Sequence, residues 1–222
     1  MNNKKKVVLF WSGGKDSALA LKRIKEDPEL ELVSLLTTFD TKSSEIKYHG
    51  VPEVLITQQA MLMNLPLIRV YLPEDCDNES YKLALKKYFD LFKAKGIEYM
   101  AFGDIHLEDI RKYREELLAE NGLKALFPLW KQDPLKLLAE FQQSGHRAII
   151  TSVDEKRIPL PFLAKEINLE LLKDFPDIDP LGENGEYHTF VSFGPYFKMR
   201  VLYSKNVTVS QGPYTICKLR EA

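Results

Sequence analysis

Apolar residues gather in short runs along the first half of the chain, and amphipathic segments separate these runs. The runs at 7–11, 31–39, 65–73 and 98–105 have the length of strands and few polar interruptions, as expected of strands that are buried on both faces. Segments 17–27, 53–65, 79–96 and 106–122 have the spacing of helices. Strands that alternate with helices over short connections predict a parallel sheet covered by helices on both faces.

The pattern changes after Leu123. A short proline-broken stretch leads to a predicted helix at 133–145 and a predicted strand at 147–154, and the remainder is rich in Pro, Gly and aromatic residues. We expect an α/β fold with a five-stranded, parallel, doubly wound (Rossmann-like) sheet and a smaller C-terminal α+β lobe. The expected domains are 1–125 and 126–222. Residues 40–51 are too polar for a core and are expected to form a mobile loop.

Composition narrows the function classes without selecting one. The 222 residues are 45% hydrophobic, and 31 Lys and Arg nearly balance 32 Asp and Glu, so bulk charge gives no argument for a nucleic-acid or membrane partner. Cys76 and Cys217 form no CxxC pair and suit a reducing compartment. The apolar run after the N-terminal lysines is too short for a secretory signal. We therefore expect a cytoplasmic protein.

Residues 12–17 read SGGKDS and follow the first predicted strand. The sequence differs from the Walker A loop, because Asp16 stands where Ser or Thr is required and Leu9 stands at the first glycine position. It nevertheless has the features that bind an anion in a Walker A loop. Two glycines let backbone amides approach the anion, and a helix start, two hydroxyl groups and Lys15 add donors. The loop therefore predicts a phosphate site, whereas a simple capped turn is the alternative.

Three further groups of polar residues lie later in the chain. Gly103 and Asp104 end the fourth strand, where a carboxylate faces the same crevice as the loop, unless Asp104 caps the next helix. On that helix, Arg111 and Arg114 either reach an anion or pair with acidic neighbours. Residues 182–189 read GENGEYHT and place acids, an amide and a histidine among turn-forming glycines.

These motifs carry a resemblance to known families. SGGKDS at a first strand is the signature of the PP-loop ATP pyrophosphatases, which have the adenine nucleotide alpha hydrolase-like (HUP) fold, and the chain resembles that superfamily. Together with GDI at 103–105 and GENGEYHT at 182–189, the chain resembles the diphthine–ammonia ligase family almost end to end. Leu181 departs from the family pattern, in which a small residue or cysteine precedes the glycine.

The resemblance implies an ATP-dependent amidation. The carboxylate of diphthine on translation elongation factor 2 would be adenylated with loss of pyrophosphate, and ammonia would then displace AMP. A Mg²⁺ ion would bridge the phosphates, with Asp16 or Asp104 as its ligands. No glutaminase module fits in the chain, so ammonium would come from solution.

Residue roles follow from matching the motifs to this chain. The expected nucleotide-binding residues are Ser12, Gly13, Gly14, Lys15, Asp16, Ser17, Thr37, Thr38, Gly103 and Asp104. The expected acceptor-binding residues are Gly182, Glu183, Asn184, Gly185, Glu186, Tyr187, His188 and Thr189. The expected catalytic residues are Lys15, Asp16, Asp104, Glu183, Glu186 and His188, the last three as bases that deprotonate ammonium.

Other functions stay open at this stage. A PP-loop enzyme could adenylate a small carboxylate or a tRNA base, although Lys and Arg do not outnumber Asp and Glu in residues 125–222. A nucleotide-binding module without turnover is the third alternative, and a homodimer is left open. Diphthine also carries a trimethylammonium group that aromatic faces could hold. Core packing explains the candidate residues for such a cage equally well: Tyr187, Phe190, Phe193, Tyr196 and Phe197.

Overall fold

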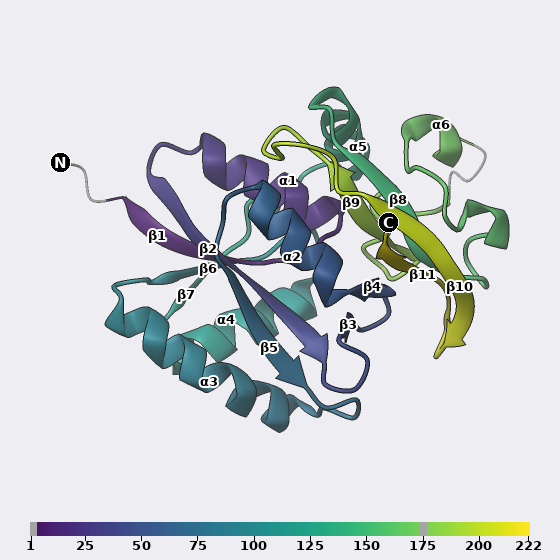
Figure 1. The fold of residues 1–222 in the computed structure, drawn as a ribbon. Helices are drawn as coiled ribbons and strands as arrows, with labels where there is room; N and C mark the ends of the chain where they lie inside the picture. The colour runs from purple at the N-terminus through teal and green to yellow at the C-terminus, as the bar shows by residue number, and fades with distance from the viewer. Residues whose placement is uncertain (1–3, 174–176) are drawn as a thin grey trace.

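The computed structural model describes residues 4–173 and 177–222 and contains two main sheets (Figure 1). The first sheet is parallel and five-stranded, with the order β5-β2-β1-β6-β7. Its strands are β1 (Lys5–Phe10), β2 (Leu30–Asp40), β5 (Leu67–Leu72), β6 (Tyr99–Ala101) and β7 (Lys124–Leu126). The α/β fold and the parallel five-stranded sheet expected from the sequence are confirmed.

Four helices cover the two faces of this sheet: α1 (Lys15–Glu26), α2 (Glu53–Leu62), α3 (Asn78–Ala94) and α4 (Glu108–Glu120). Successive side chains of a strand point to opposite faces. Val7 and Leu9 accordingly pack in the core that contains residues of α1 and α2, whereas Val8 packs with residues of α3 and α4. All three side chains are fully buried, which explains the uninterrupted apolar run of β1.

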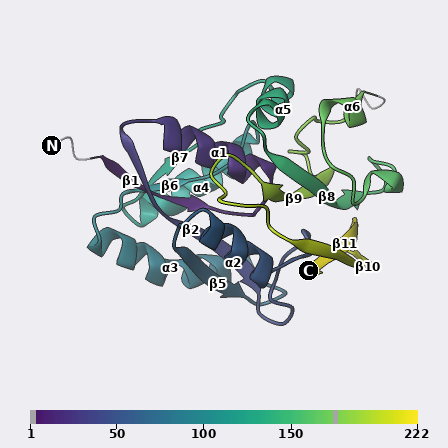
Figure 2. The same cartoon turned by 45° about the horizontal axis from the view of Figure 1, so that its top comes forward.

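The second sheet is antiparallel, with the order β10-β11-β8-β9. It consists of β8 (Arg147–Asp154), β9 (Tyr187–Phe193), β10 (Tyr203–Gln211) and β11 (Tyr214–Glu221). Helices α5 (Pro134–Gln143) and α6 (Leu169–Leu172) and the 3₁₀-helix η1 (Leu160–Phe162) complete this part. Figure 2 shows β9 lying beside α1, and a single hydrophobic core runs from α1 into β8 and β9. The division into domains 1–125 and 126–222 stays a prediction.

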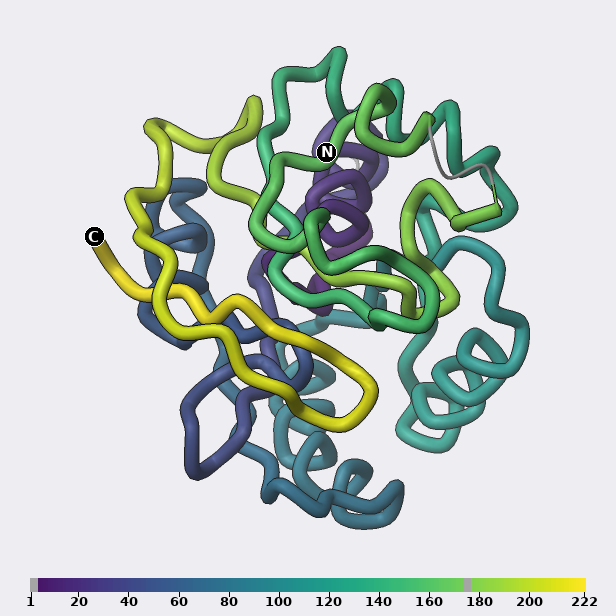
Figure 3. The backbone as a smooth tube through the Cα atoms, turned by 90° about the vertical axis from the view of Figure 1, so that its right-hand side faces the viewer, coloured from purple at the N-terminus to yellow at the C-terminus, as the bar shows by residue number. Residues whose placement is uncertain are grey.

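The segment predicted as a polar loop at 40–51 is instead a small hairpin of β3 (Glu45–Ile46) and β4 (Val51–Pro52). The expectation that it lies outside the core is wrong, because Ile46 and Val51 are buried. The amide of Leu219 in β11 donates to the carbonyl of Gly50 at 3.0 Å, and the C-terminal hairpin lies across this segment in Figure 3. Contact with the second sheet therefore orders a segment whose own sequence is polar.

Two other differences concern strands β6 and β7 of the first sheet. β6 covers only three of the eight residues predicted as the fourth strand, so Phe102, Gly103 and Asp104 lie beyond its end. The stretch expected to be short and proline-broken supplies β7, the fifth strand. Among the described helices, none is long and apolar enough to cross a membrane.

Gly50 and Gly96 allow a matched test of the hairpin's packing. Both have a positive φ, +65° and +68°, but a methyl group at Gly50 would overlap Cγ2 of Ile216, whereas one at Gly96 meets nothing within 4 Å. We expect Gly96→Ala to cost about 1 kcal/mol of unfolding free energy for the backbone conformation alone. Gly50→Ala should cost about 1–3 kcal/mol more from overpacking. Equal losses in denaturant titrations would show that the hairpin does not pack as described.

Candidate functional site

A cavity of about 370 Å³ opens beyond the ends of β1, β2 and β6. The carboxyl edge of a parallel sheet, where the strand order reverses, is the usual ligand site of such folds. Residues from all three sequence motifs reach it. Those predicted residues that line the cavity are Ser12, Asp16, Ser17, Thr37, Thr38, Gly103, Asp104, Glu183 and His188.

The SGGKDS loop (residues 12–17) connects β1 to α1 in a constrained conformation. Gly13 has φ +74°, and a methyl group there would overlap the side chains of Ile56 and Gln59. A methyl group at Gly14 would lie 3.1 Å from the carbonyl oxygen of Thr189. Both glycines therefore allow the loop to pack closely between α2 and β9, and the loop directs the N-terminus of α1 toward the cavity.

The side chain of Gln59 holds this loop in place. The sequence pattern did not reveal this residue. Its side chain is fully buried, accepts from Nε1 of Trp11 at 2.8 Å and donates to the carbonyls of Gly13 (3.1 Å) and Val191 (2.7 Å). The amide of Val191 also donates to the Gly13 carbonyl at 2.8 Å. One amide side chain thus joins the end of β1, the loop and β9. A glutamine in a predicted helix carries no local signal of such a role.

Thr189, predicted to bind the acceptor, contacts the SGGKDS loop. Gly14, at the N-cap position of α1, has no side chain to cap the helix, and Oγ1 of Thr189 accepts from the amide of Lys15 at 3.1 Å. A residue of β9 thereby satisfies one of the free amides at the helix start. The SGGKDS and GENGEYHT motifs are parts of one site.

Lys15 is buried at the start of α1 and pairs with Asp16, whose side chain is partly exposed. Their charged atoms lie 3.1 Å apart, and the Lys15 ammonium lies 4.7 Å from the centre of the Tyr187 ring. Burial raises the pKa of Asp16, and the positive charge of Lys15 opposes that shift. Oδ1 of Asp16 is buried without a hydrogen-bond partner. Lys15 itself does not line the cavity, but the Asp16 carboxylate does.

The end of β6 brings Asp104 against the loop. A methyl group at Gly103 would lie 2.9 Å from the backbone carbon of Asp16, so only glycine permits this approach. Helix α4 has Leu107 at its N-cap position, which excludes the alternative of Asp104 as the cap. Instead, Asp104 pairs with Nε of Arg114 at 2.9 Å. Arg111 pairs with Glu115 at 2.8 Å, in agreement with the alternative of an acid-paired helix face.

The GENGEYHT segment contributes turns as well as site residues. Gly182 and Gly185 have positive φ and pack against the rings of Tyr187 and Tyr214. Oε1 of Glu183 accepts from the amide of Ile105 at 2.7 Å, and burial raises the pKa of this carboxyl group. Glu183 lines the cavity beside the segment that follows β6.

Glu186 is buried but lies outside the cavity lining. Its Oε1 accepts from Asn184 at 3.3 Å and lies 3.9 Å from Arg157, whereas its Oε2 has no hydrogen-bond partner. The hydroxyl of Tyr187 donates to the carbonyl of Pro180 at 2.6 Å. Of the candidates for an aromatic cage, Tyr187, Phe190 and Phe197 are buried in the core, which agrees with the packing alternative.

His188 stacks on His49, a second residue that sequence reasoning missed. The ring centres lie 4.3 Å apart at an interplanar angle of 22°, and both rings line the cavity. Burial and the charge of Lys15 lower the pKa of His49 to about 4. Burial, His49 and Lys15 hold the pKa of His188 well below its usual value. Both imidazoles are therefore neutral near pH 7.

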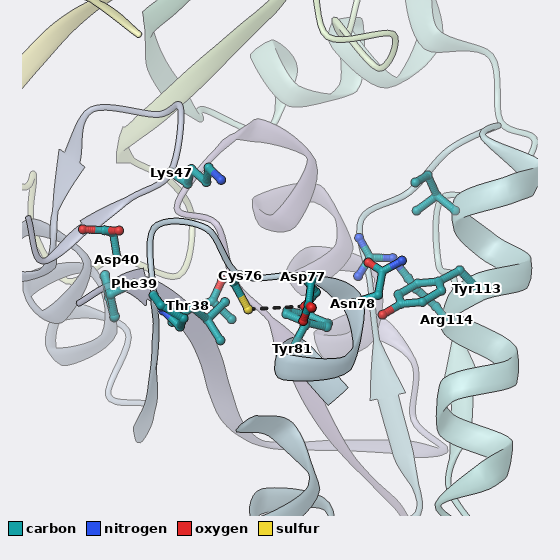
Figure 4. Close-up of a pocket in the computed structure, with 13 residues that line it drawn as sticks. Thr38, Phe39, Asp40, Lys47, Cys76, Asp77, Asn78, Tyr81, Tyr113 and Arg114 are labelled. Atoms are coloured by element: carbon teal, nitrogen blue, oxygen red, sulfur yellow. Dashed lines mark hydrogen bonds between the residues drawn. The ribbon is translucent and has the colours of Figure 1, made fainter. Parts of the chain in front are cut away.

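A second cavity, of about 310 Å³, adjoins the first (Figure 4). Thr38, Tyr81 and Arg114 line both cavities. Figure 4 shows Tyr113 and Arg114 on α4 facing Asn78 and Tyr81 at the start of α3. In the described parts of the chain, no cluster of three or more His, Cys, Asp and Glu side chains is arranged to hold a metal ion. Cys76 and Cys217 are both free thiols.

The role of Gln59 can be tested against its neighbour in the sequence. We expect Gln59→Leu to lower the unfolding free energy by about 2 kcal/mol or more, because buried donors and acceptors lose their partners. It should also weaken nucleotide binding, measured by calorimetry, because the loop is no longer held. Gln58→Leu is the control: Gln58 is partly exposed and bonds Glu221, so its replacement should change stability by less than about 0.5 kcal/mol. Similar losses for both variants would argue against this role.

The charge of Lys15 should be visible in the titration of His49. In a Lys15→Met variant we expect the pKa of His49 to rise from about 4, because one cause of its depression is removed while burial persists. NMR titration of the imidazole signals measures this shift. His146 is an internal control. Its pKa is also lowered to about 4, but by burial and Lys22 rather than by Lys15. An unchanged His49 titration would contradict the described proximity.

Comparisons with known proteins identify the family of the chain. The family model for the diphthamide synthase N-terminal domain matches residues 5–125, and that for the C-terminal domain matches residues 133–221. Curated relatives named diphthine–ammonia ligase come from Schizosaccharomyces pombe (28% identity over 97% of this chain), Danio rerio (28% over 92%) and Rattus norvegicus (29% over 92%). The chain covers 88% and 85% of the two vertebrate proteins but only 39% of the yeast protein.

Among solved structures, the U34-tRNA thiolase NcsA from Methanococcus maripaludis with its [4Fe-4S] cluster aligns with a TM-score of 0.37 and 17% identity. The alignment covers 64% of this chain and 56% of that protein. The two diphthamide synthase models together cover residues 5–125 and 133–221, a span that includes all three motifs. The chain therefore belongs to the diphthamide synthase family.

Proposed function

We propose that the protein is an ATP-dependent ligase that adenylates a carboxylate and then transfers ammonia to it, with release of pyrophosphate and AMP. The carboxylate is that of diphthine on elongation factor 2, in line with the name of its relatives. One observation carries the proposal: Glu183 and His188 line the same cavity as Ser12, Asp16 and Ser17. A nucleotide and a second reactant can meet in that cavity, which is the main requirement of a two-substrate ligase.

In this proposal the triphosphate of ATP lies at the SGGKDS loop. Ser12 and Ser17 line the cavity beside the positive end of the α1 dipole, which favours an anion there. Because the amide of Lys15 is already bonded to Thr189, Lys15 contributes through its side-chain charge. Thr37 and Thr38, at the end of β2, border the adenine. Donors around the departing pyrophosphate stabilise the transition state more than the ground state.

Asp16 and Asp104 are the proposed ligands of a Mg²⁺ ion. Magnesium sites at phosphates commonly use one or two carboxylates and complete their shell with phosphate oxygens and water. Both carboxylates line the cavity, and the buried, unpartnered Oδ1 of Asp16 is an acceptor that a cation would satisfy. The donor set therefore fits the ion, which when bound would neutralise charge on the leaving pyrophosphate.

We assign the nucleotide to residues 1–125 and the acceptor mainly to residues 126–222. Residues 182–189 border the cavity through Glu183 and His188, while Gly182 and Gly185 shape the turns. The side-chain amide of Asn184 donates a hydrogen bond to Oε1 of Glu186. Glu183, Glu186 and His188 stay the proposed bases.

One assay tests the activity. The protein is incubated with α-labelled ATP, Mg²⁺, ammonium and elongation factor 2 that carries diphthine. We expect labelled AMP and pyrophosphate only when the factor is present, and Lys15→Ala should lower the rate about 10²-fold or more because the pyrophosphate loses a fixed charge. Lys25→Ala, an exposed lysine on the same helix, is the matched control and should retain full activity.

The outcomes separate the alternatives. ADP as the product, or no turnover with the factor, would contradict the ligase proposal. AMP formed equally well without the factor would indicate a different acceptor. Full activity of Lys15→Ala would contradict the assignment of the SGGKDS loop.

A further inference from the structure

The second cavity, of about 310 Å³, adjoins the proposed reaction cavity and has no part in the function proposed so far. Its lining includes the half-buried residues Tyr81, Tyr113 and Arg114 and the exposed residues Asp77 and Ile110. The cavity is therefore open to the protein surface. A side chain carried by another protein can enter it.

Two tyrosine rings line this cavity from different helices. Tyr81 belongs to α3 and Tyr113 to α4, and Figure 4 shows Tyr113 facing Asn78 and Tyr81. Burial raises the pKa of both phenols, so both rings are uncharged at neutral pH. A quaternary ammonium group has no hydrogen to donate, and aromatic faces are the usual protein surface that binds it.

The lining also carries charges of both signs. Hydrogen bonds from backbone amides hold the pKa values of Asp40 and Asp77 below the usual range, so both carboxylates are ionised near pH 7. The exposed Lys47 donates from its ammonium group to the carbonyl of Glu74 at 3.0 Å. A lining of ionised acids, cations and aromatic rings suits a zwitterion better than an uncharged nucleobase.

Arg114 lies where the two cavities meet, because it lines both of them. Its Nε and Nη2 lie 2.9 and 3.2 Å from the two carboxylate oxygens of Asp104, and the guanidinium lies 4.2 Å from the centre of the Phe102 ring. These contacts hold the guanidinium at the junction. Asp104 offsets part of its positive charge, so a cation can approach the neighbouring tyrosines at a lower electrostatic cost.

The first cavity can hold the nucleotide without the second. The rings of Phe10 and Phe102 stack at 4.6 Å, and both residues line the first cavity beside Thr37 and Thr38. They offer the adenine an apolar surface next to the end of β2. The second cavity is therefore available to the acceptor.

We propose that the second cavity binds the trimethylammonium group of the acceptor through Tyr81 and Tyr113, while Arg114 lies beside the acceptor carboxylate at the junction with the first cavity. The proposal rests on the ligase function proposed above. In diphthine the carboxylate and the trimethylammonium group are attached to the same carbon, so their binding residues must be neighbours. Tyr113 and Arg114 are adjacent on α4 and both line the cavity. The acceptor then contacts both parts of the chain.

Two small probes of the same shape test the preference for a cation. Glycine betaine and tert-butylacetate both carry a carboxylate, but a carbon atom replaces the cationic nitrogen in the second. Their binding is measured by NMR while a non-hydrolysable ATP analogue fills the first cavity. We expect glycine betaine to bind about fivefold more tightly or better, and Tyr113→Leu to remove this preference. Equal affinities of the unaltered protein for the two probes would overturn the proposal.

Ligase kinetics with diphthine-bearing elongation factor 2 test the aromatic face. Tyr113→Leu should raise the KM for the factor about fivefold or more and keep kcat within about twofold, because it removes binding that ground and transition states share. Tyr113→Phe keeps the ring and should behave as the unaltered protein. Tyr88→Leu is the matched control, because Tyr88 is a half-buried tyrosine of α3 that lines neither cavity.

A second variant removes a charge and preserves the fold. Asp77 caps α3 by accepting from the amide of Ser80, and asparagine caps helices equally well. Asp77→Asn should therefore fold normally and raise the KM for the factor about twofold or more, because the ammonium group loses a nearby negative charge. An unchanged KM in both Asp77→Asn and Tyr113→Leu would overturn the proposal.

The two proposals fail in different ways. If the unaltered protein forms no AMP with the factor, the ligase function fails, and the acceptor subsite fails with it. If the unaltered protein is active and Tyr113→Leu keeps its KM, the subsite alone is overturned. If Tyr113→Leu weakens the binding of ATP in the absence of the factor as strongly as it raises the KM, the cavity holds part of the nucleotide, which also overturns the subsite.

Discussion

The contact between the SGGKDS loop and β9 is the constraint on which the rest of the site depends. The loop carbonyl at Gly13 receives two hydrogen bonds, one from the Val191 amide and one from Gln59, and the Lys15 amide donates to Thr189. A strand from the other sheet thus completes the start of α1, so the antiparallel sheet helps to shape the proposed nucleotide site.

This arrangement explains why two lobes share one hydrophobic core. A mobile second lobe would break the backbone bond to Gly13 and leave buried groups unpaired, at a cost of about 1–3 kcal/mol for each. The same contact brings Glu183 and His188 to the cavity at the sheet edge. Fold stability and the geometry of the cavity thus depend on the same few hydrogen bonds.

Charge in the cavity follows a consistent pattern. Each strong charge near the loop has a partner: Asp16 with Lys15, and Asp104 with Arg114. Paired charges cost less to bury than isolated ones, and they leave the cavity ready for an anion with its counter-ion. The two stacked histidines stay neutral near pH 7 in this setting, because burial and the charge of Lys15 lower their pKa values.

The sequence by itself determined the parallel sheet and the phosphate loop, because uninterrupted apolar strands, helical spacing and the SGGKDS string are local signals. Only the tertiary structure decided that Thr189 caps α1, that Gln59 holds the loop and that His49 faces the cavity. Gln59 and His49 lie in segments with no distinctive pattern, and the GENGEYHT motif does not indicate that its Thr189 contacts α1. Their roles arise from contacts between residues far apart in the chain, which hydrophobic periodicity does not encode.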